Sequence, residues 1–177
     1  LNENAIVTDD GIAINKHTNA KISACLPMHT FGIPCDVHEI TAVCKTFRLP
    51  VVEDAAEALG SFRAGKHVGT ESFAGTISFN GNKVITTGGG GMILTNSDAL
   101  ASSLRHKSAT SKVNHPYLYV HDQIAYNYRM PNINAALGLG QIERLPSILQ
   151  KNRILFEEYK LFCDTYDIQI SKPPEDT

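Results

Sequence analysis

The chain has 177 residues, of which 42% are hydrophobic and 19% are charged, with a formal net charge of −2 and a pI near 6.4. This composition is typical of a globular domain that can bury a sizeable core. It argues against nucleic acid as the main partner, because there is no run of basic residues. A membrane span is also not expected, because no stretch approaches about eighteen consecutive apolar residues.

The first half of the chain predicts a β-α-β unit. An apolar run at 22–28 favours a buried strand, and Asp36 followed by Glu39 is typical of a helix start. One face of the predicted helix is apolar, with residues three and four apart: Val37, Ile40, Val43, Cys44 and Phe47. Pro50 ends this helix, and 51–54 follows as a second buried strand. This order implies a parallel sheet with ligands at the carboxyl ends of its strands, where Asp54 lies.

The second half is predicted to add strands and helices around two loops. We expect strands at 74–79 and 92–95, helices at 97–107, 132–142 and 146–166, and a strand that begins at 168–170. The stretch 115–131 has no clear periodicity and is predicted to be a long loop. A long loop in a compact domain is usually functional or interfacial.

Both ends of the chain read as interior sequence. The start, Leu1-Asn2-Glu3-Asn4, has no initiator Met and none of the features of a signal peptide. The end, 172–177, stops without a closing element. We therefore expect a fragment of a longer protein. Its four cysteines form no CxxC pair and are expected to be reduced thiols in a cytoplasmic protein.

Three residues could together bind an aldehyde cofactor. Asp54 ends an apolar strand, where a carboxylate is costly to bury unless a cation such as a pyridinium nitrogen neutralises it. Lys83 follows an apolar strand and a glycine turn, and a lysine there could attack a carbonyl once it is deprotonated. Ser78, five residues before Lys83, could hold a phosphate oxygen. A capping Asp54 and a surface Lys83 are the alternatives.

Other motifs give weaker signals. The run Thr86-Thr87-Gly88-Gly89-Gly90-Gly91 matches neither established phosphate-binding glycine pattern and is interpreted as a loop that needs positive φ or close backbone approach. A metal site is the alternative chemistry, with candidate ligands His29, Cys35, His38 and Cys44. The spacing of His38 and Cys44 puts them on different faces of one helix, and no HExxH or CxxC motif is present. No metal site is therefore predicted.

Taken together, five stretches resemble the DegT/DnrJ/EryC1/StrS family of sugar aminotransferases, which depend on pyridoxal 5'-phosphate (PLP). The matching stretches are Met28–Asp36, Val52–Gly60, Ser78–Lys83, Thr86–Met92 and Tyr126–Pro131. The resemblance implies an α/β fold of the fold type I, aspartate aminotransferase-like class. This is a three-layer α/β/α arrangement with a mostly parallel sheet, of which the chain would hold part. Residues 1–145 would belong to the large PLP-binding domain, and 146–177 would form the connecting helix and the start of the small domain.

The resemblance also implies a role for each site residue. Lys83 would form the Schiff base with the cofactor and then move the proton between donor and product carbons. Asp54 would pair with the pyridine nitrogen, and Ser78 would contact the phosphate. Glu57 occupies the position where many members have Gln near the ring oxygen. Asn127 is similar to a residue that reaches the phosphate of a neighbouring subunit, which implies a homodimer with shared active sites.

The expected activity is transamination of a nucleotide-linked 4-keto-6-deoxy sugar, with glutamate as donor, for cell-surface polysaccharide. The four-glycine run with Asn80-Gly81-Asn82-Lys83 resembles the branch that aminates UDP-linked N-acetyl sugars on routes to bacillosamine and legionaminic acid. Related sugar dehydratases have His in place of the lysine, so Lys83 favours transamination. The alternatives are a non-catalytic or regulatory relative and an inactive fragment.

Overall fold

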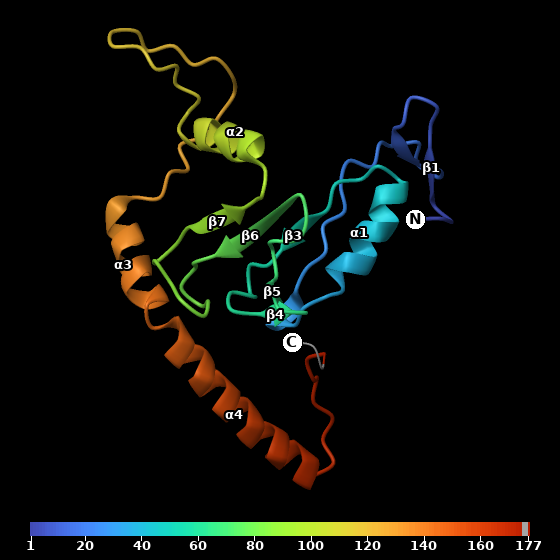
Figure 1. Ribbon diagram of the computed structural model, residues 1–177, viewed down its shortest axis with the longest axis vertical. Coiled ribbons are helices and arrows are strands. Elements are labelled where there is room, and N and C mark those ends of the chain that lie inside the picture. Colours follow the sequence, from blue (N-terminus) through green and yellow to red (C-terminus); the bar gives the residue numbers. More distant parts are fainter. Residues whose placement is uncertain (175–176) are drawn as a thin grey trace.

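The computed structural model describes residues 1–174 and 177 (Figure 1). The elements in chain order are β1 (Ala5–Val7), β2 (Ala13–Asn15), the short 3-10 helix η1 (Thr30–Gly32), α1 (Val37–Thr46), β3 (Val52–Asp54), β4 (Phe62–Arg63), β5 (Lys66–His67), β6 (Ala74–Ser78), β7 (Gly91–Leu94), α2 (Asp98–Ser108), α3 (Asn132–Ile142) and α4 (Leu145–Thr165).

The central sheet has the strand order β3-β6-β7. β3 and β6 are parallel, whereas β7 runs antiparallel to β6. The segment 25–28 lies on the other side of β3 and pairs with it in parallel through bridges at Cys25–Val51 and Met28–Asp54. Helix α1 connects this segment to β3, so the order extended segment, helix, strand agrees with the predicted β-α-β unit, although 25–28 makes isolated bridges and not a continuous strand. The sheet is mixed because of β7.

Helix α1 begins as its sequence predicts and packs through part of the predicted apolar face. Oδ1 of Asp36 accepts a hydrogen bond of 2.9 Å from the backbone N–H of Glu39, which satisfies one of the free donors of the first turn. Val37 and Cys44 are buried, and Cys44 packs in a cluster with Ala13, Leu49 and Val51. Val43, expected on the same face, is exposed. The apolar stripe is therefore narrower than predicted.

Two predicted strands are wrong. The segment 22–28 makes only isolated bridges, and Leu26 and Met28 are 66% and 47% exposed. Pro27 has no N–H to donate, which prevents a continuous ladder through this segment. Residues 168–170 form no strand, and no described strand pairs with them. The small antiparallel pairs β1-β2 and β4-β5 were not predicted.

One face of the central sheet carries the core. Ile77, Phe79 and Ala55 are buried there, and Leu145 and Ile148 of α4 pack against the same cluster. Side chains alternate along a strand, so Thr76 and Ser78 point away from this core. Helix α4 begins at Leu145, close to the expected start of the long helix. The division into two domains stays a prediction.

The described helices include none that is both long and apolar enough to cross a membrane.

Candidate functional site

Two of the predicted site residues, Asp54 and Ser78, lie on the same open face of the sheet. Asp54 of β3 is in register with Thr76 of β6, so both side chains lie on the same face. Ser78 lies two residues further along β6, on that face as well. Oδ1 of Asp54 accepts a hydrogen bond of 3.1 Å from the N–H of Ala56, and the described residues provide no other partner for this carboxylate. One carboxylate oxygen is therefore available to a bound cation.

Lys83 lies beside Glu57. The Nζ atom of Lys83 is 3.4 Å from Oε1 of Glu57, and the two side chains are 17% and 29% exposed. The other oxygen of Glu57 accepts a hydrogen bond of 3.0 Å from the backbone N–H of Phe31. Three loops that are distant in sequence therefore meet at one carboxylate, and the structure brings the predicted residues Glu57 and Lys83 together.

The segment that carries Lys83 forms a closed loop after β6. The Lys83 N–H donates to the carbonyl of Asn80, and the N–H of Thr87 donates to the carbonyl of Phe79. Phe79 in turn donates its N–H to the carbonyl of Gly90. Gly88 and Gly90 have φ of +78° and +109°, which confirms that the glycine run contains positions of positive φ.

Helix α3 contacts this loop through two amide side chains that the sequence reasoning missed. Oε1 of Gln141 accepts from the N–H of Thr86 at 3.0 Å, and Nε2 donates to the carbonyl of the same residue at 2.6 Å. Nδ2 of Asn134 donates to the carbonyl of Thr87 at 2.6 Å. The two amides are seven residues apart on a helix, which puts them on one face, and that spacing was the available signal.

A buried polar cluster lies behind Asp54. His29 and Glu53 are almost fully buried, and Nε2 of His29 is 3.0 Å from Oε2 of Glu53. Glu53 also accepts from the N–H of Gly69 and from the hydroxyl of Ser72. Burial alone would raise the pKa of Glu53, but the hydrogen bonds from His29, Gly69 and Ser72 outweigh it and lower this pKa to about 2. The cluster was not predicted.

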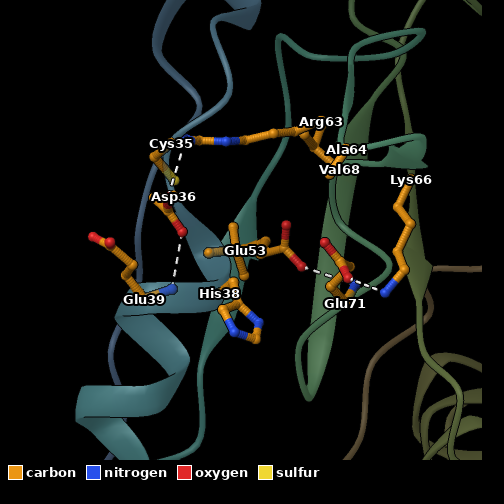
Figure 2. Close-up of a pocket in the computed structure, with 11 residues that line it drawn as sticks. Cys35, Asp36, His38, Glu39, Glu53, Arg63, Ala64, Lys66, Val68 and Glu71 are labelled. Carbon is orange, nitrogen blue, oxygen red and sulfur yellow. Dashed lines mark hydrogen bonds and ion pairs between the residues drawn. The ribbon is translucent and has the colours of Figure 1, made fainter. Parts of the chain in front are cut away.

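A cavity of about 300 Å³ is lined in part by Glu53 (Figure 2). Its lining includes Cys35, His38 and Glu53, and Asp36 and Arg63 form an ion pair of 2.9 Å across it. None of the predicted site residues lines this cavity. It is therefore distinct from the open face that carries Asp54.

The candidate metal ligands are not brought together. Nδ1 of His29 lies 3.5 Å from Sγ of Cys35, but Cys44 is buried in the cluster with Val51 and His38 is exposed. Within residues 1–174 and 177, no three His, Cys, Asp or Glu side chains form a group that could hold a metal ion.

Asn127 lies apart from the other predicted site residues. It is exposed and pairs with Ala109, next to the end of α2, through an antiparallel bridge. The segment 109–131, which we call the arm, extends from α2 away from the central sheet (Figure 1). Within the described chain, no hydrogen bond joins Asn127 to Asp54, Ser78 or Lys83. Its predicted role in a neighbouring subunit stays a prediction.

The sequence model of the DegT/DnrJ/EryC1/StrS aminotransferase family matches residues 8–175 of the chain. The GDP-perosamine synthase of Escherichia coli is 42% identical over 91% of this chain and 43% of its own length. That of Vibrio cholerae is 37% identical over 93% of this chain and 44% of its own length. The chain therefore spans less than half the length of these relatives.

Solved structures are similar over most of the chain. A DegT DnrJ EryC1 StrS aminotransferase from Brucella abortus has a TM-score of 0.83 at 26% identity, over 91% of this chain and 43% of that one. PseC of Helicobacter pylori, an aminotransferase of pseudaminic acid biosynthesis, has a TM-score of 0.69 at 29% identity, over 74% of this chain and 36% of that one. These similarities confirm the predicted fold type I class.

Proposed function

The chain belongs to the DegT/DnrJ/EryC1/StrS aminotransferase family, and from this premise we propose that the protein transfers an amino group from glutamate to a nucleotide-linked keto sugar. The observation that carries the proposal is the register of β3 and β6, which aligns Asp54 and Thr76, with Ser78 further along the same face. Lys83 follows on the next loop. PLP is the cofactor of this family.

The side chains present fit this cofactor. A pyridine ring nitrogen, a phosphate and an aldehyde need a carboxylate, a hydroxyl or N–H donor, and an amine respectively. Asp54, Ser78 and Lys83 offer this set, and the carboxylate of Asp54 has only one local hydrogen bond. When bound, PLP supplies an electron sink that stabilises negative charge at the reacting carbon.

The residues of this chain then have separate tasks. Asp54 would hold the ring nitrogen in its charged form, because an adjacent carboxylate favours the cation. Ser78 would orient the phosphate. Lys83 would bind the aldehyde carbon through Nζ, with the aldehyde oxygen leaving as water, and would carry a proton between the donor and product carbons. Glu57, whose Oε1 lies 3.4 Å from Nζ of Lys83, would contact the ring substituents.

Membership of the family does not identify the nucleotide of the substrate. The four-glycine run beside Asn80 and Lys83 supports a UDP-linked 4-keto-6-deoxy N-acetyl sugar. Two relatives at 42% and 37% identity are instead named for a GDP-linked product. We propose a 4-keto-6-deoxy sugar in either case, made in the cytoplasm for cell-surface polysaccharide. Parallel assays with GDP-linked and UDP-linked substrates test which nucleotide the enzyme accepts.

We also propose a homodimer in which Asn127 of one subunit reaches the cofactor phosphate of the other. The exposed position of Asn127 supports this, because within the described chain it has no hydrogen bond to Asp54, Ser78 or Lys83 of its own subunit.

The test uses the protein as the cell produces it, supplied with PLP. We expect a visible absorption band that glutamate converts to the amine form of the cofactor, and no such band in Lys83→Ala. A protein that binds the cofactor but never responds to glutamate is the non-catalytic relative. An unchanged spectrum in Lys83→Ala rejects the lysine assignment.

A further inference from the structure

Helix α3 holds the loop that carries Lys83 at two consecutive backbone positions. The amide of Gln141 makes paired hydrogen bonds with the N–H and the carbonyl of Thr86. The amide of Asn134 donates to the carbonyl of Thr87. Thr86 lies three residues after Lys83, and Thr87 is buried.

The amide of Gln141 suits this contact with Thr86, because it accepts from an N–H and donates to a carbonyl at once. Neither a carboxylate nor an ammonium group can do both. The helix also approaches closely, because a Cβ atom at Gly138 would lie 2.8 Å from Cγ2 of Thr87. The fit of helix to loop is therefore specific in both shape and hydrogen bonding.

The contact also limits how the loop can move. The N–H of Thr87 and the hydroxyl of Thr86 both bond to the carbonyl of Phe79, at the end of β6. Gln141 therefore holds the loop to helix α3, while the bonds to Phe79 hold the same loop to the end of the strand that carries Ser78. Between these two attachments lies Lys83. Among the described residues, its Nζ has only the 3.4 Å contact with Glu57 as a side-chain bond.

We propose that Gln141, assisted by Asn134, is a positioning residue that sets the reach of Lys83 toward the cofactor aldehyde. This inference rests on the proposed function. Gln141 does not touch the cofactor itself but acts through the backbone of Thr86. The arm that carries Asn127 leads directly into α3, so the same helix connects the arm to the lysine loop.

The test compares Gln141→Met, which keeps the side-chain length but removes both hydrogen bonds, with Gln150→Met. Gln150 is exposed on α4 and has no side-chain hydrogen bond within the described residues. Without cofactor, we expect hydrogen exchange of the amides at 84–88 to be about tenfold faster in Gln141→Met and unchanged in Gln150→Met. Asn134→Ala, which removes one bond, should show a smaller increase and serves if Gln141→Met does not fold.

The second measurement adds PLP to the same proteins. We expect Gln141→Met to bind the cofactor covalently at Lys83 several-fold more slowly, as trapped by borohydride, and to shift the pH midpoint of the visible band. Gln150→Met should match the unmodified protein in both. The positioning role would be overturned if Gln141→Met exchanged its amides faster but trapped the cofactor at the same rate and kept the same pH midpoint. Unchanged hydrogen exchange in Gln141→Met would overturn it as well. An unmodified protein that never binds PLP at Lys83 would instead reject the proposed function.

Discussion

Nε2 of His29 lies 3.0 Å from Oε2 of Glu53, and both side chains are almost fully buried. The same carboxylate accepts from the N–H of Gly69 and from the hydroxyl of Ser72. Glu53 therefore joins β3 to the loop before η1 and to the turn before β6. Asp54 is the next residue and points to the opposite face, so this cluster fixes the backbone on which the proposed cofactor ligand stands.

Replacement of Glu53 by Gln should lower stability and flatten its pH dependence. The hydrogen bonds lower the pKa of Glu53 from 4.5 to about 2. Because the pKa is lower in the folded state, the stabilisation is complete above pH 4.5 and is lost as the pH falls toward 2. A shift of this size corresponds to about 3 kcal/mol. Urea unfolding from pH 2.5 to 7 measures this, with Glu158→Gln on the exposed face of α4 as control. If the free energy of unfolding changed equally with pH in Glu53→Gln and in the unmodified protein, the low pKa of Glu53 would be contradicted.

Gly75→Ala should be strongly destabilising. A Cβ atom at Gly75 would lie 2.2 Å from the carbonyl oxygen of Gly69 and 2.5 Å from its Cα, so backbone must move. We expect a loss of about 2–3 kcal/mol in the free energy of unfolding. Gly81→Ala is the matched control, because a Cβ there meets no atom within 4 Å and its φ is not positive. Similar urea midpoints for the two variants would refute the close approach of Gly75 to Gly69.

The features that the sequence predicts correctly depend on short-range patterns. Helix α1 has a capping Asp36 and apolar residues at helical spacing, and both signals lie within about a dozen residues. The position of Asp54 at the end of a strand follows from the apolar run before it. The positive φ of Gly88 and Gly90 likewise follows from composition alone.

The features that could not be predicted depend on contacts between distant segments. Gln141 and Thr86 are 55 residues apart, and nothing near either residue specifies the other. Glu53 reads as an ordinary strand residue until the fold brings His29 and Gly69 to its carboxylate. Tertiary packing decides such pairs, because a buried polar group takes whichever partner the fold supplies.

Glu57→Ala should cost more stability than Glu57→Gln. Gln can still accept from the N–H of Phe31, whereas Ala loses that bond and the contact with Lys83 together. We expect Glu57→Gln to stay within about 0.5 kcal/mol of the unmodified protein, because a partly exposed ion pair contributes little, and Glu57→Ala to lose about 1 kcal/mol more. Urea unfolding at pH 7 measures both. Equal losses would mean that the bond to Phe31 contributes nothing.

Subunits that carry different defects should complement each other if Asn127 acts across a dimer. In a hybrid of Lys83→Ala and Asn127→Asp subunits, the site on the Asn127→Asp subunit keeps its own Lys83 and receives an intact Asn127 from its partner. The other site has both defects. Asp at 127 would repel the cofactor phosphate, so each variant alone should be nearly inactive.

The hybrid, purified through two different affinity tags, should therefore have about half the activity of the unmodified dimer, because one of its two sites is intact. If Asn127 instead served its own subunit, both sites of the hybrid would carry one defect and no activity would return. The exposed position of Asn127 beside Ala109, without a hydrogen bond to the cofactor residues of its own subunit among the described residues, favours recovery. An inactive hybrid of the correct size would exclude shared sites.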